Sequence, residues 1–143
     1  MTYVKKAFCI IAVAALAGCG MMGSGSSGGG KAVSVSLSGS EEVPPLSVPG
    51  SGRGSFTVGE DGSVSGSVTT TGVQGTMAHI HRGARGQNGP VVVPLAKSGD
   101  TYTAPAGAKL SAADLQAFRE GRLYVNVHTD RNKGGEVRGQ MAP

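Results

Sequence analysis

The chain predicts an all-β domain, a Greek-key antiparallel β-sandwich or barrel of about seven or eight strands with one short helix. Glycine, serine, threonine and valine dominate, and turn residues recur about every eight to twelve positions, as in such domains. Between the turns, short segments alternate apolar and polar residues, which is typical of strands with one buried face. No repeat at solenoid spacing is visible, so a repeat architecture is not expected.

The first half of the domain predicts three strands and one irregular segment. Valine and leucine alternate with small residues in residues 32–37, so this strand has one buried face. Residues 43–46 contain two prolines, which cannot donate to a strand ladder, and we expect this segment at an edge or corner. Residues 54–58 and 63–70 flank Glu-Asp-Gly at 60–62, which predicts a hairpin because Asp-Gly favours the positive φ angles of a tight turn.

Five further strands follow in the second half. They are expected at residues 77–81, 91–95, 101–103, 123–128 and 136–141.

One helix interrupts this series. Ser111 is a candidate N-cap, and Asp114 falls in the first helical turn. Leu115 and Phe118 form a short apolar face, and Gly121 is expected to end the helix.

The N-terminus resembles the signal peptide of a bacterial lipoprotein. Lys5 and Lys6 precede an apolar run at residues 7–16 that is too short to cross a bilayer. The following Leu-Ala-Gly-Cys at residues 16–19 resembles a lipobox, which implies cleavage before Cys19 and acylation of that cysteine. An ordinary secretory signal with an incidental cysteine is the alternative.

This resemblance divides the chain into three parts. Residues 1–18 are expected to be the signal peptide, residues 19–30 the lipidated cysteine and a flexible Gly/Ser linker, and residues 31–143 the folded domain. In lipoproteins of this kind an aspartate after the cysteine retains the protein in the inner membrane. Because Gly20 stands there, we expect a lipid anchor in the outer membrane, on the cell envelope and in contact with the periplasm.

Charge and cysteine content exclude several functions. Loss of Lys5 and Lys6 lowers the basic residues from 13 to 11 against 9 acidic residues, so the mature net charge is +2. Without tryptophan or a basic stripe, nucleic-acid binding is not predicted. Cys9 leaves with the signal and Cys19 is expected to carry lipid, so no thiol remains for a disulfide or a thiolate ligand. Any metal must be bound by nitrogen, oxygen or a thioether.

All three histidines of the chain lie in two predicted strands. His79 and His81 share one face of the earlier strand, with Met77, because side chains alternate across a strand. His128 lies on the half-polar face of the later strand. If the two strands are neighbours, three imidazoles converge, and neutral imidazole suits copper and zinc. Imidazoles that serve only as buried hydrogen-bonding groups are the alternative.

Four other residues are candidates for roles around this site. The thioether of Met77 is a candidate weak axial ligand that would favour Cu(I), although packing is its commoner role. Asn126 can orient a ligand as an outer hydrogen-bonding partner, or serve as a structural amide. Arg82 and Arg85 can attract anions beside the metal, or lie on an ordinary solvated loop.

Three separated motifs in the chain resemble those of the CHRD domain. Residues 37–45 look like its opening signature, residues 78–92 like its central motif, and residues 121–140 like its C-terminal motif. CHRD domains occur in chordin, an extracellular binder of growth factors, and widely in bacterial secreted proteins. The resemblance implies a fold family and leaves the activity open.

The histidine motif is also similar in layout to the copper half of Cu/Zn superoxide dismutase. This resemblance implies that His79 and His81 match the paired strand histidines and His128 the late copper histidine. No further histidine and no cysteine pair remain for a zinc bridge or a loop disulfide, so the site is at most mononuclear. The layout, the oxidising location and the affinity of nitrogen sites favour copper, with zinc as the alternative.

Three functions remain open at this point. The first is a lipid-anchored CHRD module that binds one copper ion for sequestration, delivery or tolerance. The second is a copper enzyme that dismutates superoxide, so whether the protein is an enzyme stays undecided. The third is a metal-free adhesion or protein-binding domain whose partner is an envelope protein.

Overall fold

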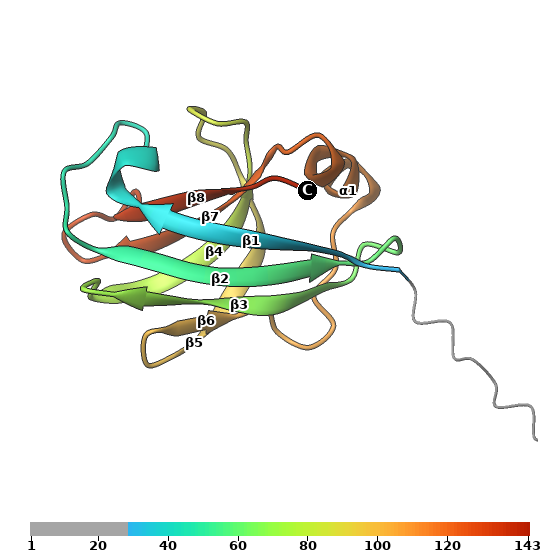
Figure 1. The fold of residues 1–143 in the computed structure, drawn as a ribbon, viewed down its shortest axis with the longest axis horizontal. Helices are drawn as coiled ribbons and strands as arrows, with labels where there is room; N and C mark the ends of the chain where they lie inside the picture. The colour runs from blue at the N-terminus through green and yellow to red at the C-terminus, as the bar shows by residue number, and fades with distance from the viewer. Residues whose placement is uncertain (1–28) are drawn as a thin grey trace, which may run out of the picture.

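Eight antiparallel strands close into a barrel in the part of the chain that this computed structural model describes, residues 29–143 (Figure 1). The order around the barrel is β1-β2-β3-β6-β5-β4-β7-β8, and β8 pairs with β1 to close it. The all-β prediction with one short α-helix is confirmed. The strands are β1 Lys31–Ser38, β2 Ser51–Val58, β3 Val64–Thr71, β4 Gly75–Arg82, β5 Val91–Ser98, β6 Thr101–Thr103, β7 Leu123–Thr129 and β8 Val137–Met141.

The barrel interior holds the apolar side chains that strand alternation predicts. On β1, Val33, Val35 and Leu37 are buried, whereas the serines between them are exposed. Each buried aliphatic or aromatic side chain contributes about 1.5–3 kcal/mol relative to an exposed one. The same core includes Phe56, Val68, Ile80, Tyr102, Phe118, Leu123, Val125, Val127, Val137 and Met141.

The hairpin between β2 and β3 forms at the predicted turn. Gly62 has a φ of 86°, a left-handed value that glycine adopts without steric cost. The Asp61 carboxylate accepts hydrogen bonds from the backbone N–H and the hydroxyl of Ser63, at 3.0 and 2.7 Å. The local chemistry of Asp-Gly-Ser is therefore enough to place this turn.

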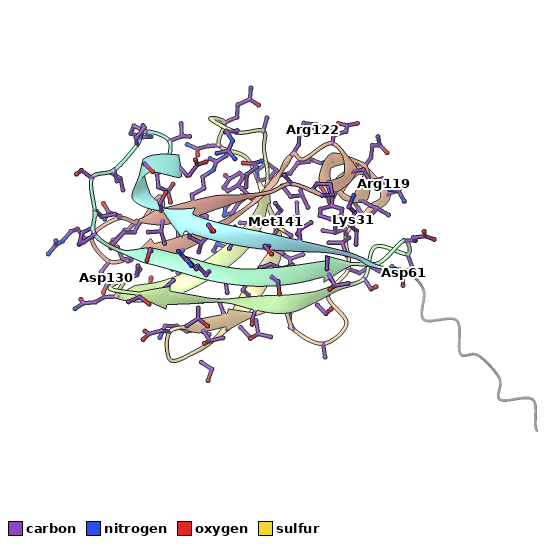
Figure 2. The ribbon with its side chains drawn as sticks, viewed as in Figure 1. Lys31, Asp61, Arg119, Arg122, Asp130 and Met141 are labelled. Atoms are coloured by element: carbon purple, nitrogen blue, oxygen red, sulfur yellow. The ribbon has the colours of Figure 1, made fainter. Side chains whose placement is uncertain are left out.

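The helix α1, Ala112–Arg119, begins and ends close to its predicted bounds. Ser111 is its N-cap, and the Ser111 hydroxyl oxygen accepts a hydrogen bond of 3.1 Å from the backbone N–H of Asp114. Ala117 and Phe118 are buried against the barrel, and Gly121 follows the helix with a φ of 69°. The helix lies at the end of the barrel where β1 begins and the chain terminates (Figures 1 and 2).

Other predicted boundaries differ from the observed ones in an informative way. Residues 43–46 belong to no strand and follow a short 3-10 helix, η1 Gly39–Glu41, on the outside of the barrel. β5 continues beyond the apolar run 91–95 as far as Ser98, because the barrel pairs it with β6.

No helix among residues 29–143 is both long and apolar enough to cross a membrane. The predicted signal peptide, Cys19 and most of the linker lie outside the described residues.

Candidate metal centre

The candidate site lies on the outer face of β4, away from the apolar core. Ala78 and Ile80 point into the barrel and are each 1% exposed. Met77, His79 and His81 therefore point outward, because successive side chains of a strand alternate between its faces. The predicted division of this strand into two faces is confirmed.

Antiparallel pairing of β4 with β7 brings the histidines together. Met77 lies opposite His128, and His79 lies opposite Asn126. Nδ1 of His79 is 3.0 Å from Nε2 of His128. One ring nitrogen from each of His79, His81 and His128 lies within 4.8 Å of the others. Over residues 29–143 no other group of three histidine, cysteine or acidic side chains meets in this way.

Two backbone carbonyls orient the imidazole rings. Nδ1 of His81 donates to the Gly89 carbonyl at 3.0 Å, and Nδ1 of His128 donates to the Lys133 carbonyl at 2.9 Å. With these protons on Nδ1, the neutral rings present their Nε2 lone pairs to the cluster. Nε2 of His81 is buried and has no hydrogen-bond partner. These two bonds thus favour the tautomers of His81 and His128 whose Nε2 atoms can bind a metal, while His79 turns its Nδ1 toward Nε2 of His128.

The surroundings favour neutral imidazoles. Burial lowers the pKa of His79 below its ordinary value, and the neighbouring His128 and His81 rings lower it further. Burial also lowers the pKa of His81, although the Gly89 carbonyl opposes this shift. Because a metal binds only the unprotonated ring, these shifts extend the pH range in which the ligands are available.

This donor set can hold a metal ion. Two ligand atoms bound to one metal at about 2.0 Å lie roughly 2.8–3.3 Å apart in square-planar or tetrahedral geometry. The separation of 3.0 Å between His79 and His128 falls in that range. His81 and His128 are each 9% exposed and His79 is half-buried, so the cluster is shielded and still reaches solvent.

The side chains of Tyr124 and Arg138 stack behind the His81 ring. The rings of His81 and Tyr124 are parallel within 8° at a centroid distance of 4.9 Å. The guanidinium carbon of Arg138 lies 3.5 Å from the centre of the Tyr124 ring. The Tyr124 hydroxyl accepts a hydrogen bond of 3.1 Å from the backbone N–H of Gly89, the residue whose carbonyl holds His81. Gly89 and Tyr124 therefore fix the His81 ring together.

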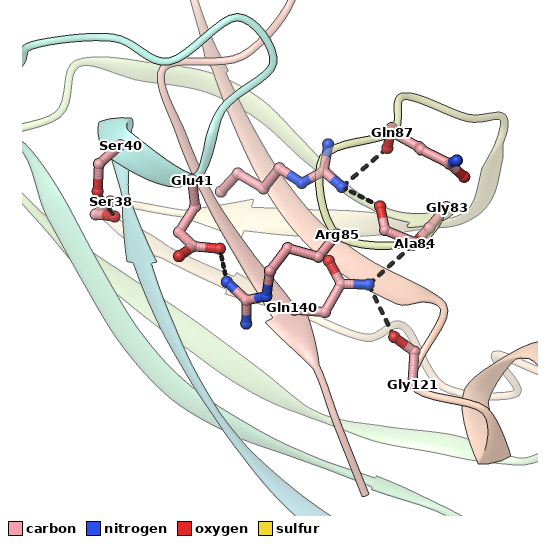
Figure 3. A network of polar contacts seen from close by, with 10 residues as sticks. Ser38, Ser40, Glu41, Gly83, Ala84, Arg85, Gln87, Gly121 and Gln140 are labelled. Carbon is pink, nitrogen blue, oxygen red and sulfur yellow. Dashed lines mark hydrogen bonds and ion pairs between the residues drawn. The ribbon is translucent and has the colours of Figure 1, made fainter.

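Arg138 ties the loop between β4 and β5 to the barrel. Its side chain is 1% exposed and donates to the carbonyls of Ala84 and Gln87, at 3.0 and 2.9 Å, and to the Asn88 side chain at 3.3 Å. Gln140 donates to the carbonyls of Gly83 and Gly121 at 2.8 and 2.9 Å (Figure 3). These bonds fold the loop over the outer face of β7, so this strand is buried on both faces.

A buried carboxylate completes the covered side of the site. Glu42 is 5% exposed and accepts a hydrogen bond of 2.7 Å from the Asn126 side chain. Burial raises the pKa of Glu42 to about 7, while Arg138, the Val43 backbone and Asn126 oppose the shift. The Asn126 oxygen is buried without a hydrogen-bond partner. The Asn126 side chain thus donates to Glu42, and its role in orienting a metal ligand stays a prediction.

The two candidate arginines have carboxylate partners. Arg82 bonds to Asp114 at the start of α1 at 3.0 Å. Arg85 pairs with Glu41 on η1, beside the Gln140 network (Figure 3). An anion-attracting role for these residues stays a prediction, whereas their contacts show that both connect separate segments of the fold.

Sequence reasoning missed the residues that cover the site. No motif in the sequence marks Glu42 or Arg138 as residues near the histidines. One available signal was the outer face of residues 123–128, which carries tyrosine, asparagine and histidine but no formally charged side chain. Solvated faces usually carry lysine, glutamate or aspartate, so this composition indicates a covered face.

The fold and this cluster define a class of protein: a closed antiparallel β-barrel domain with three imidazoles converging on its outer face. Comparison with known families then gives the identity of the domain. The model of the CHRD domain matches residues 33–141, and the chain belongs to this family. No curated protein and no solved structure matches the chain.

Proposed function

We propose that the protein is a lipid-anchored module of the cell envelope that binds a single copper ion through His79, His81 and His128. Its role would be the sequestration or delivery of copper, or tolerance to it. The observation that carries the proposal is the convergence of three ring nitrogens within 4.8 Å. The carbonyl bonds to Nδ1 of His81 and His128 support it, because they leave ligand lone pairs directed at one point.

Copper is preferred to zinc on chemical grounds. Nitrogen donors bind Cu(II) more tightly than other divalent first-row metals, including zinc. The mature domain offers no thiolate, the ligand that structural zinc sites often use. Zinc held by the same three histidines remains the alternative metal.

The position of the cluster suits a protein anchored through Cys19 in the outer membrane. The cluster lies level with the far end of β1. Ser38 at that end pairs with Arg138, Arg138 pairs with Asn126, and Asn126 pairs with His79. β1 runs from Lys31 to Ser38, and its two ends are about 23 Å apart at the usual rise of a strand. An anchored domain would therefore present the site away from its attachment point, toward a soluble partner.

Titration of the purified protein with Cu(II), followed by electron paramagnetic resonance, tests the proposal. We expect one equivalent of copper with nitrogen hyperfine coupling. His81→Asn is the informative variant, because its amide can still donate to the Gly89 carbonyl while the ligand atom Nε2 is absent. Gln116→Ala, on the exposed surface of α1, is the control and should bind copper as the wild type does.

Three results separate the alternatives. Absence of stoichiometric copper uptake would overturn the proposal and leave the metal-free protein-binding function. Tighter uptake of Zn(II) in direct competition would reassign the metal. A dismutase assay on the copper-loaded protein distinguishes a binding module, which is inactive, from a superoxide dismutase-like enzyme.

A further inference from the structure

Met77 is an apolar side chain that the fold leaves in solvent beside the histidine cluster. It is 51% exposed, and among the large hydrophobic side chains of residues 29–143 only Val91, at 49%, is similarly exposed. Met77 therefore does not contribute to the core. Its thioether sulfur is a soft ligand, whereas the Val91 side chain has no donor atom.

Strand register places Met77 closer to the backbone of His128 than it places His79 or His81. Met77 lies directly opposite His128, whereas His79 and His81 lie two and four residues further along β4. Directly opposed residues have Cβ atoms about 4.5–5.5 Å apart. The His128 ring reaches His79, whose Nδ1 is 3.0 Å from its Nε2. Met77 lies two residues before His79 on the same face of β4, a spacing that a long, flexible side chain can bridge.

Other groups contact the cluster at His81 and at the Nδ1 atoms. Tyr124 is stacked on His81, and the carbonyls of Gly89 and Lys133 take the Nδ1 protons of His81 and His128. Further protein ligands from the β8 side are blocked by the Tyr124 and Arg138 stack. Met77 lies at the other end of the cluster, opposite His128 and four residues from the His81 ring on which Tyr124 is stacked.

We infer that Met77 is a fourth ligand, used when copper is in the Cu(I) state, so that the site retains copper through reduction. The inference rests on the proposed copper function. Three imidazoles suit Cu(II), and addition of a thioether favours the softer Cu(I). Reduction consumes one electron per copper from an external reductant such as ascorbate, and the bond gained is the coordinate bond between copper and sulfur.

The test compares affinities for the two oxidation states in matched variants. Cu(I) affinity is measured anaerobically with ascorbate, in competition with the chelator bicinchoninate, and Cu(II) affinity in competition with nitrilotriacetate. Met77→Leu should lower the Cu(I) affinity about tenfold or more and change the Cu(II) affinity by less than about twofold. Val91→Ala is the control. Val91 is similarly exposed and lies next to the cluster, opposite His81, but it has no donor atom, so both affinities should be unchanged.

A direct signature of sulfur coordination accompanies this comparison. Addition of Ag(I), a redox-inert substitute for Cu(I), should shift the methyl ¹³C resonance of Met77. The resonance of Met141, which is fully buried in the core, should not move. If the wild type binds Cu(II) and Met77→Leu binds Cu(I) as tightly as the wild type does, this inference alone is overturned. A wild type that takes up no Cu(II) would overturn the proposed function as well.

Discussion

Replacement of Gly89 by alanine should disrupt the histidine site from a loop position that bears no ligand. An alanine Cβ would lie 1.7 Å from the Arg82 carbonyl oxygen, whereas real Cβ atoms essentially never approach closer than 3.0 Å. The loop must therefore move by about 1.3 Å, the difference between these two distances. That displacement lengthens the 3.0 Å bond from His81 and the 3.1 Å bond to Tyr124 beyond hydrogen-bonding range.

The two lost hydrogen bonds set the expected magnitude. Each contributes about 1 kcal/mol net, so with the residual steric strain Gly89→Ala should destabilise the protein by about 2–3 kcal/mol. Loss of the partner that orients a metal-binding histidine should also weaken Cu(II) binding about 10- to 100-fold. Urea denaturation of the metal-free protein measures the first effect, and calorimetric titration with Cu(II) measures the second.

Gly134→Ala is the matched control for this change. Gly134 lies in the loop that holds His128, its φ is not left-handed, and an added Cβ would meet nothing within 4 Å. Both measurements on this variant should match the wild type. If Gly89→Ala bound Cu(II) with wild-type affinity, the Gly89 carbonyl would not orient His81, and the reasoning would be refuted.

Three further predictions concern charge around the site. Because the pKa values of His79 and His81 are lowered in the folded state, the unfolded chain binds more protons at these residues. The metal-free wild type should therefore lose stability relative to His81→Asn as the pH is lowered below about 6.5. The pKa of Glu42 is raised from 4.5 to about 7, so its contribution is present below pH 4.5 and is lost as the pH rises through 7. Glu42→Gln should therefore be more stable than the wild type by about 1–3 kcal/mol at pH 8 and equal to it at pH 4. Arg138→Met should lose about 3 kcal/mol of stability in urea denaturation, and Arg138→Lys should recover little of it, because an ammonium cannot replace the planar guanidinium on Tyr124.

Each of these has a contrary outcome. A stability difference between the wild type and His81→Asn that does not change between pH 7 and pH 4 would show that His81 is not desolvated. Equal stability of Glu42→Gln and the wild type at pH 8 would show that the carboxylate is hydrated. Full recovery by Arg138→Lys would show that charge alone, without the fork of hydrogen bonds, holds the loop.

The histidine faces could be predicted because strand periodicity is a local property. The alternation of residues 77–81 determines that His79 and His81 share a face, whatever the strand packs against. The same holds for the Asp61-Gly62 turn and for the Ser111 cap of α1, where hydrogen bonds within three residues decide the conformation.

The surroundings of the site could not be predicted in the same way. Glu42 and Asn126 are 84 residues apart in sequence and become hydrogen-bonded partners only when the barrel closes and η1 folds against β8. The burial of Arg138 likewise depends on the loop of residues 83–90, whose glycines leave its local conformation open.

The sequence by itself determined the class of fold, the two faces of the alternating strands, the helix cap and the strand faces on which the histidines lie, because each follows from side-chain alternation or from contacts within a few residues. Only the tertiary structure decided that β4 and β7 are adjacent, that Met77 lies opposite His128, and that loops cover the outer face of β7. The physical reason is that strand register and loop closure depend on contacts between distant segments, whose free energy no local pattern encodes.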